Sequence, residues 1–494
     1  MGAFTLATAL FLYLGILFTI SQLLAKSKSN ATFFRAGNKA PWYLVAFGMI
    51  GATLSGVTYI SVPGWVQHTQ LSYVQMVLGY GLGYFFIASV LLPLYYKKNL
   101  VSIYTYIGER FGNASHKTAA WFFVISRLAG TSFRLFLVLK VIHWIALDAL
   151  EFPFWLSAAV ALFSIWLYTQ KTGIKTIIYT DTLQTVCMLL SLGIAIYIIG
   201  NSLHIDSSTL LTWWQQQPNT QVFFWDDWNS SQHFVKQFFG GVFIAFAMTG
   251  LDQEMMQKNL SCRSLKEAQK NMLWFTLALI LVTISFLILG VLLTAYSSTH
   301  GLHATGDYLF GVVATKSGLG TVLTAAFVLG LIAAAFSSAD SSLTSLTTSI
   351  SIDLWRIEKG ANGIKQRKKI HISTALVLWL CIVTFYYFIK DESVIKQLLL
   401  FAGYTYGPLL GLFLMGIYTK RKVRDSWVPS ICILTPVFSY LIVLGAKDMY
   451  GFDFGFLVLA LNGFLTLLML HLSGIGLPVY QRTSPGESTS KSGE

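Results

Sequence analysis

The chain has 494 residues, of which 55% are hydrophobic and only 11% are charged. Soluble domains carry about 25% charged residues, so this composition excludes a soluble globular protein. The formal net charge is +13, but the basic residues stand in short segments between apolar stretches, which indicates membrane topology rather than a nucleic-acid-binding surface. We therefore expect a lipid bilayer around the chain and no nucleic-acid partner.

Apolar stretches long enough to cross a bilayer recur from one end of the chain to the other. A spanning helix needs about 20 predominantly apolar residues. Windows of this length predict thirteen spans, at about 3–22, 42–67, 73–96, 118–147, 152–170, 174–200, 234–256, 271–296, 319–352, 371–389, 394–419, 427–446 and 453–476. The predicted fold class is an all-α polytopic membrane protein with 13 transmembrane helices.

The distribution of basic residues predicts the orientation. Most of the 34 Lys and Arg residues follow odd-numbered spans, such as Lys258, Arg263, Lys266 and Lys270 after span 7. Basic loops favour the cytoplasmic side, so the N-terminus is expected outside and the C-terminus in the cytoplasm. We expect a multi-pass protein of the cell (inner) membrane.

Two sets of five spans organise the chain. Because five is odd, the second set enters the membrane from the opposite side, which is the arrangement of inverted repeats. Glycine interrupts the first span of each set, at Gly51 and Gly56 and again at Gly250, and such breaks indicate a midplane site. The predicted division is a first helix and cytoplasmic loop (1–41), repeat one (42–200), an external loop (201–233), repeat two (234–420), two peripheral helices (421–476) and a disordered cytoplasmic tail (477–494).

Four polar features fall at one depth of the predicted membrane. They are Gly51 to Leu54 in span 2, Arg127 in span 4, Asp181 in span 6 and Ser337 to Ser341 in span 9. At 1.5 Å per residue, each lies near mid-membrane, where transporter sites form. Each feature alone is also explained by helix packing or a structural ion pair. Their coincidence at one depth favours a binding site.

Span 9 carries a stripe of small and polar residues. The residues that recur at steps of three and four are Ala334, Ser337, Asp340, Ser341, Thr344, Ser345 and Thr348. This spacing places them on one face of the helix. A face of hydroxyl groups with one carboxylate offers the oxygen ligands that a hard cation requires.

Five segments in order resemble the sodium/solute symporter family, whose members carry glucose, proline, iodide, vitamins and sialic acid with sodium. They are Phe34 to Trp42, Tyr179 to Gln184, Asp252 to Lys258 with Ala268 and Gln269, Ala334 to Asp353, and Gly407 with Pro408. The resemblance covers nearly the whole chain. It implies a LeuT-type fold of 5+5 inverted repeats and no enzymatic activity.

The resemblance also implies sodium (Na⁺) as the coupling ion. Matched by position, the ligands are the backbone carbonyls of Gly51, Leu54 and Ala334 and the hydroxyls of Ser337 and Ser338. Relatives that use two sodium ions have a carboxylate and hydroxyls at positions matching Asp181 and Ser341. Asp340 adds an acid nearby, which leaves the number of sodium ions, and proton coupling, open. Asp252 and Gln253, at the inner end of span 7, are expected to act in gating.

The predicted substrate site combines hydroxyls with one cation. Residues matching the substrate positions of the sialic-acid branch are Thr53, Ser55, Thr58 and Tyr73, with Arg127 as the carboxylate ligand, while Val77 departs from that branch. Span 4 contains three basic residues, Arg127, Arg134 and Lys140. A midplane arginine suits a carboxylate, so we expect an organic anion such as a sugar acid or monocarboxylate; a neutral sugar or polyol is the alternative.

Other membrane functions find little support in the sequence. A channel requires a pore-lining filter, and the motifs of hydrolases, zinc proteases and phosphate-binding loops are missing from the sequence. The prediction is therefore a symporter that works by alternating access, as a monomer, on a small polar solute.

Overall fold

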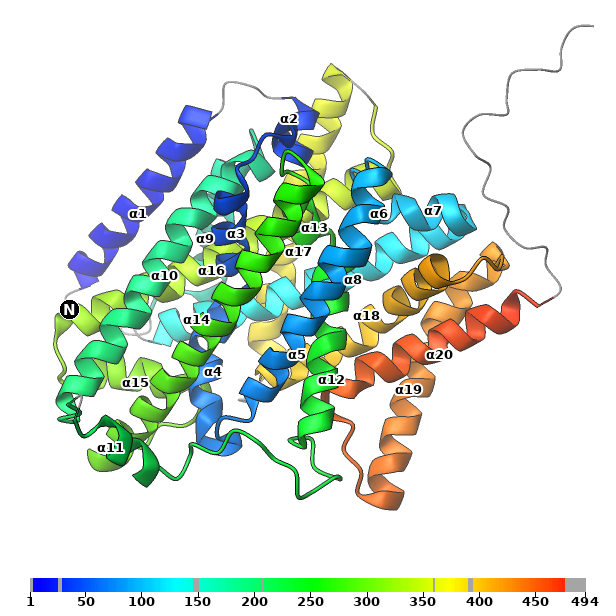
Figure 1. The fold of residues 1–494 in the computed structure, drawn as a ribbon. Coiled ribbons are helices and arrows are strands. Elements are labelled where there is room, and N and C mark those ends of the chain that lie inside the picture. The colour runs from blue at the N-terminus through cyan, green and yellow to red at the C-terminus, as the bar shows by residue number, and fades with distance from the viewer. Residues whose placement is uncertain are drawn as a thin grey trace, which may run out of the picture.

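The computed structural model describes residues 3–24, 29–144, 151–206, 208–358, 360–389 and 394–475. Within these ranges the chain is helical and contains no β-strand, apart from an isolated bridge between Ala40 and Cys262. Figure 1 shows the helices gathered into one bundle, in which most long helices run obliquely in a similar direction. The tail expected to be disordered, 477–494, lies outside the described residues.

Nine helices of the described residues are long and apolar enough to cross a membrane. They are Tyr73–Lys97, formed by α5 (Tyr73–Phe86), a π-helical turn (Ile87–Leu91) and α6 (Leu92–Lys97); α8 (Asn113–Ile142); α10 (Ile174–Ser202); α14 (Leu265–Thr299); α16 (Thr321–Ser349) extended to Leu354; α17 (Ala361–Phe388); α18 (Val394–Tyr418); α19 (Val428–Tyr450); and α20 (Val458–Ser473). The multi-pass membrane architecture expected from the sequence is therefore present.

Two further candidate spans are helix pairs bent at a short break. The first joins α3 (Trp42–Thr53) to α4 (Gly56–Thr69) at 58°, and the second joins α12 (Phe234–Ala245), with its π-helical extension to Gly250, to α13 (Gln253–Asn259) at 69°. Counting each pair as one span gives eleven. The breaks fall beside the glycines that the sequence singled out.

The remaining helices are not among these candidate spans. α1 (Ala3–Leu24) has 22 residues, and α9 (Phe154–Thr169) has 16. Small helices cover the ends of the bundle: α2 (Asn30–Arg35), α7 (Thr105–Phe111), α11 (Leu210–Gln216) and α15 (Leu309–Lys316). The spans predicted at 3–22 and 152–170 correspond to α1 and α9, so the count of thirteen stays a prediction.

The centre of the bundle is α16. Its apolar window is 78% buried, against 28% for α19, and it contacts α3, α4, α8, α10 and α13. Figure 1 shows α19 and α20 at the rim of the bundle, beside α18. The hydroxyl groups of α16 therefore face other helices, as the stripe in the sequence predicts.

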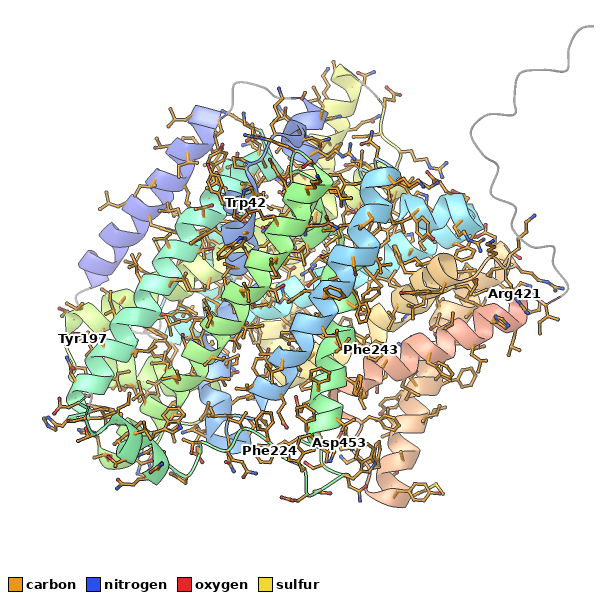
Figure 2. The ribbon with its side chains drawn as sticks, viewed as in Figure 1. Trp42, Tyr197, Phe224, Phe243, Arg421 and Asp453 are labelled. Atoms are coloured by element: carbon orange, nitrogen blue, oxygen red, sulfur yellow. The ribbon has the colours of Figure 1, made fainter. Side chains whose placement is uncertain are left out.

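The outer surface of the bundle is apolar. Tyr197 is 69% exposed and Leu281 is 66% exposed, and exposed apolar side chains of this size are suited to lipid. Figure 2 shows Tyr197 on the outside of the bundle, Phe224 and Asp453 towards one end and Trp42 towards the other.

Candidate sodium and substrate sites

The first cluster of oxygen atoms lies where α3, α10 and α16 meet. Ser337 Oγ on α16 donates to Asp181 Oδ1 on α10 at 2.7 Å. Gly51 of α3 faces the same point, because a Cβ atom there would lie 3.1 Å from Ser337 Oγ and would overlap Thr185 Oγ1. The missing side chain thus lets the α3 backbone approach the hydroxyl groups of α10 and α16.

The break after α3 supplies backbone oxygens beside this cluster. Leu54 (φ −81°, ψ 68°) leaves the helical conformation, while its N–H still bonds the Ile50 carbonyl at 2.8 Å. The last carbonyls of a helix have no N–H partner within it, so they are available to a ligand. The predicted sodium ligands are the carbonyls of Gly51 and Leu54 at this end and Ala334, Ser337 and Ser338, which form one turn of α16.

The predicted sodium ligands are all carbonyls and hydroxyls, and the carboxylate of Asp181 lies beside them. No group of three or more His, Cys, Asp and Glu side chains in the described part of the chain could hold a metal ion. Neutral oxygens at a helix break suit a weakly held monovalent ion, which a carrier must also release. The donor set therefore fits sodium as a transported ion.

Two carboxylates and one ammonium group adjoin the hydroxyl cluster. Asp181 Oδ2 pairs with Lys258 Nζ at 2.6 Å and accepts from Ser341 Oγ at 3.2 Å. Asp340 Oδ1 lies 3.3 Å from the same hydroxyl, and Tyr168 donates to Asp340 Oδ2 at 2.8 Å. The interpretation of Lys258 as part of a cytoplasmic basic loop is wrong, because this residue lies in α13 and its side chain is 1% exposed.

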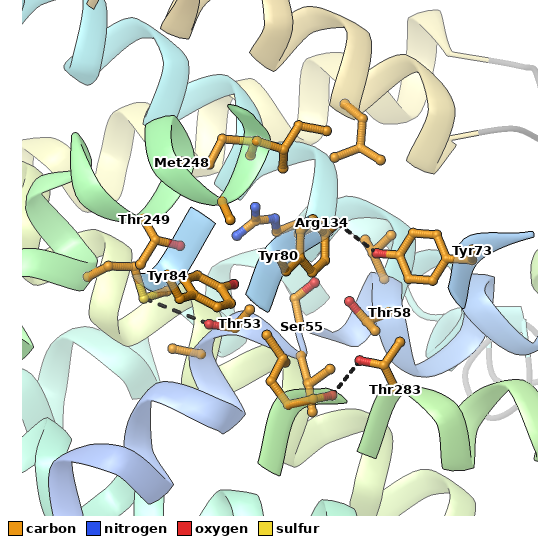
Figure 3. A pocket seen from close by; sticks show the side chains of 18 of the residues that line it. Thr53, Ser55, Thr58, Tyr73, Tyr80, Tyr84, Arg134, Met248, Thr249 and Thr283 are labelled. Carbon is orange, nitrogen blue, oxygen red and sulfur yellow. Dashed lines mark hydrogen bonds between the residues drawn. The ribbon is translucent and has the colours of Figure 1, made fainter. Parts of the chain in front are cut away.

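A cavity of about 110 Å³ lies beside the break in α3. Figure 3 shows hydroxyl groups of α3 and α4 on one side of it and aromatic rings of α5 on another. All five predicted substrate residues line the cavity: Thr53, Ser55, Thr58, Tyr73 and Arg127. Residues that the sequence analysis did not select also line it, among them Tyr80, Tyr84, Arg134, Thr249 and Thr283.

Arg127 is engaged in an ion-pair network at the α13 side of this cavity. Its Nη2 lies 2.5 Å from Asp252 Oδ2, and its Nη1 lies 3.4 Å from Glu254 Oε2. Tyr406 of α18 donates to the same Asp252 oxygen, and Ser342 of α16 donates to Glu254 at 2.5 Å. The network joins α8, α13, α16 and α18, and its Arg127 lines the cavity.

Asp252 and Gln253 fix α13, the second part of the bent helix pair. Asp252 Oδ1 accepts from the backbone N–H groups of Glu254 at 2.9 Å and Met255 at 3.2 Å, which caps α13. The Gln253 amide donates to the Val101 carbonyl at 2.9 Å and accepts from the Ile103 N–H at 3.0 Å. The two predicted gating residues therefore tie α13 to α8, α18 and the segment before α7.

Of the two arginines that line the cavity, Arg134 is the one without a carboxylate partner among the described residues. It lines the same cavity as Tyr80 and Ser55, and Figure 3 labels all three residues. Its Nη1 donates to Ser338 Oγ at 3.4 Å, and no Asp or Glu among the described residues pairs with it. Arg134 follows Arg127 by seven residues, about two helical turns, so both lie on one face of α8. This spacing is the sequence signal that could have identified it.

The chain has clear similarity to one family of known proteins. Residues 33–425 match the profile of the sodium:solute symporter family. The chain belongs to this family. As a sodium:solute symporter it is a membrane transporter rather than an enzyme, and sodium is its coupling ion, as the resemblance implied.

Several proteins similar to this symporter are named as sodium-coupled transporters of particular solutes. It is 25% identical over 484 residues to the sodium/sialic acid symporter of Proteus mirabilis, covering 93% of this chain and 92% of that one. It is 25% identical over 496 residues to the sodium/sialic acid symporter of Aliivibrio fischeri, with the same coverage of 93% and 92%. The rabbit (Oryctolagus cuniculus) sodium-dependent multivitamin transporter is 27% identical over 401 residues, 76% of this chain and 59% of that one.

The fold is also shared with a solved transporter. The structure of a Na⁺-coupled sialic acid symporter in a substrate-bound outward-open state matches with a TM-score of 0.82 at 18% identity, covering 97% of this chain and 99% of that chain. The two proteins therefore share one fold over nearly their whole length.

Proposed function

We propose that this symporter imports a small organic anion of the sialic-acid type, with sodium, by alternating access. The observation that carries the proposal is the position of Arg134, a cavity-lining guanidinium without a carboxylate partner in the described chain. An unpaired cation is costly away from water, and a bidentate carboxylate is its best partner. The names of the sialic acid symporters that resemble the chain support the same solute class.

Contact between Arg134 and Ser338 provides a physical reason for coupling. Ser338 is one of the proposed sodium ligands, and it lies 3.4 Å from the guanidinium. A sodium ion there experiences the positive charge of Arg134. A substrate carboxylate at Arg134 cancels that charge, so substrate raises sodium affinity, and sodium must raise substrate affinity by the same factor.

Arg127, the arginine selected from the sequence, has a different role in this proposal. Its bonds to Asp252 and Glu254 make it part of the network that closes the α13 side of the cavity. We assign Asp252 and Gln253 to the inner gate. Opening it requires α13 to leave Arg127 and Tyr406. Thr53, Ser55, Thr58 and Tyr73 then hold the polar groups of the solute.

The proposed sodium site consists of Gly51, Leu54, Ala334, Ser337 and Ser338. A second ion at Asp181, Asp340 and Ser341 remains a proposal, supported by the convergence of two carboxylates on one hydroxyl. These groups surround the same helix break, and each of them is buried or partly buried.

The number of spans, their division into repeats and their orientation are also part of the proposal. Nine long helices, two bent pairs, α1 and α9 would together form thirteen spans. Spans 2–6 (42–200) and 7–11 (234–420) would be LeuT-type inverted repeats, each beginning with a bent helix, with an external loop at 201–233 and peripheral helices at 421–476. We further propose the N-terminus outside, the C-terminus in the cytoplasm, the inner membrane as location, and a functional monomer.

The decisive experiment measures uptake of radiolabelled N-acetylneuraminic acid into proteoliposomes under an inward sodium gradient. Uptake is expected in Na⁺ and lost when choline replaces it. Arg134→Met should abolish uptake of the acid, because one charge-assisted partner is worth about 1.5–3 kcal/mol and an uncompensated carboxylate adds to the loss. Arg134→Lys, which keeps the charge, should retain part of the uptake.

The alternative solute, a neutral sugar or polyol, gives the opposite result. A neutral solute would be taken up by Arg134→Met nearly as well as by the native chain, and it would protect the protein against thermal unfolding when sialic acid does not. Arg127→Met does not separate the two solutes, since loss of the gate network should impair transport of either one. Uptake indifferent to sodium would contradict the symport mechanism itself.

A further inference from the structure

Lys258 is a buried amine that the cavity and the gate leave unexplained. It stands in α13, with its Nζ atom 2.6 Å from Asp181 Oδ2 and 3.5 Å from the Gly48 carbonyl of α3. Side-chain exposure is 1% for the lysine and 0% for the aspartate. A charged lysine at this depth requires a partner, and the carboxylate of α10 provides it.

Asp181 connects this ammonium group to the proposed sodium ligands. Its Oδ2 atom holds Lys258, and its Oδ1 atom accepts the proton of Ser337 at 2.7 Å. The Ser337 hydroxyl can direct only a lone pair towards sodium, because its hydrogen is directed to Asp181. Sodium at Ser337 and the ammonium group therefore lie on opposite sides of one carboxylate, and both are attracted to its charge.

Asp340 places a second buried carboxylate next to Asp181, the carboxylate that attracts both Lys258 and sodium. Asp181 and Asp340 both approach Ser341 Oγ, at 3.2 and 3.3 Å, and Lys258 is the cation in direct contact with the pair among the described residues. Without Lys258, the buried carboxylates of Asp181 and Asp340 would lie next to each other with only neutral hydrogen-bond donors around them. Such an arrangement is strongly unfavourable unless a cation enters.

We propose that Lys258 is a tethered cation that competes with sodium for Asp181. In the sodium-free carrier the ammonium group neutralises this carboxylate. The empty protein can then return to the state that accepts new substrate without an uncompensated buried charge. In the loaded carrier the same ammonium group weakens sodium binding by repulsion, which favours release of the ion. The inference rests on the sodium coupling proposed above and adds to it the residue that limits sodium affinity.

The location of Lys258 on α13 links this competition to the gate. Asp252 caps the same helix and pairs with Arg127, so the segment that closes the cavity also carries the competing ammonium group. A movement of α13 that breaks the Asp252 contacts also moves Lys258 relative to Asp181. Gate opening and a change in sodium affinity are thereby coupled mechanically.

The test compares sodium binding by the native protein and by Lys258→Met. The readout is the sodium concentration that gives half of the maximal thermal stabilisation, measured in detergent with choline chloride keeping the ionic strength constant. Removing a like charge next to the ion should lower this concentration by about tenfold or more. Lys258→Arg should behave as the native protein does, and so should Lys270→Met, which removes an exposed lysine of α14.

Transport provides a second readout that a merely structural ion pair would not give. Lys258→Met binds sodium more tightly, so it should release it slowly and show reduced net uptake. Exchange of labelled for unlabelled solute, with high sodium on both sides, does not need sodium release and should persist. Loss of net uptake and exchange together would contradict the proposal.

A second pair of variants covers the case in which Lys258→Met does not fold. Asp181→Asn leaves the ammonium group unneutralised beside the sodium site, and Asp181→Asn with Lys258→Met removes both charges. The double variant should bind sodium more tightly than Asp181→Asn. Equal or weaker sodium binding on removal of the lysine, in either background, overturns the proposal. A native protein that sodium does not stabilise at all would instead refute the sodium coupling on which it rests.

Discussion

The ion pair between Arg127 and Asp252 allows a quantitative test of the proposed inner gate. The Arg127 side chain is 5% exposed and the Asp252 side chain 0%, and Arg127 Nη2 lies 2.5 Å from Asp252 Oδ2. Asp252→Asn keeps the volume and the oxygen that caps α13 but removes the charge. Breaking a buried pair costs about 3–5 kcal/mol.

The expected change is smaller than the full cost of the pair. Glu254 remains 3.4 Å from the guanidinium and can retain part of the interaction, so we expect a loss of about 2 kcal/mol in the closed state. At about 1.4 kcal/mol per factor of ten, the ratio of open to closed inner gates should rise by about 30-fold. Sodium-dependent uptake should fall because the outward-facing state is depopulated.

Accessibility of α16 from the inner side measures this ratio directly. Thr344 is buried in α16, one turn before Thr348, which bonds Gln257 of α13. It is replaced by Cys as a reporter, and its rate of alkylation is compared with and without Asp252→Asn. Cys187, Cys381 and Cys432 are replaced by Ser or Ala. Burial raises the pKa of the native Cys262 thiol to about 12, so it contributes little background reaction at neutral pH.

The matched control is Glu109→Gln, which breaks the exposed Lys98–Glu109 pair at 2.7 Å. Surface pairs contribute about 0–1 kcal/mol, so alkylation of the reporter should not change. The reasoning fails if Asp252→Asn leaves the alkylation rate unchanged while the protein stays folded, or if Glu109→Gln accelerates it equally.

Two further predictions concern the buried oxygens. Replacing both Ser337 and Ser338 by Ala removes two proposed ligands and should raise the half-maximal sodium concentration in the thermal shift at least tenfold; an unchanged value would exclude both hydroxyls as ligands. Tyr168→Phe removes the donor to Asp340 at 2.8 Å and should cost about 1–3 kcal/mol of stability, seen as a lower unfolding temperature. Its control is Tyr197→Phe, at an exposed site, which should leave the unfolding temperature unchanged. If both variants changed the unfolding temperature equally, the hydrogen bond from Tyr168 to Asp340 would not be what stabilises the protein.

Local patterns in the sequence were sufficient to predict a helical, multi-pass membrane protein, while the count of thirteen spans stays a prediction. Hydropathy over windows of about 20 residues identified the helices, because the bilayer imposes that length on each span. Gly51, Gly56 and Gly250 marked the two bent helices, since these breaks depend on backbone freedom and on helix ends, which are properties of a few consecutive residues. The hydroxyl stripe of α16 followed from helical periodicity alone, and the structure buries it at the centre of the bundle.

The partners of the charged residues were decided by the tertiary structure. Lys258 lies among basic residues in the sequence, yet the bend after Gly250 turns α13 inward and brings its amine to Asp181. Arg127 and Arg134 share one face of α8, and only the placement of α13 engages the first with Asp252 and leaves the second in the cavity. The physical reason is that the apolar residues of a span are sufficient to place it in the bilayer. The role of a buried charged residue depends instead on the neighbour that neutralises it, and that neighbour comes from a helix distant in the chain.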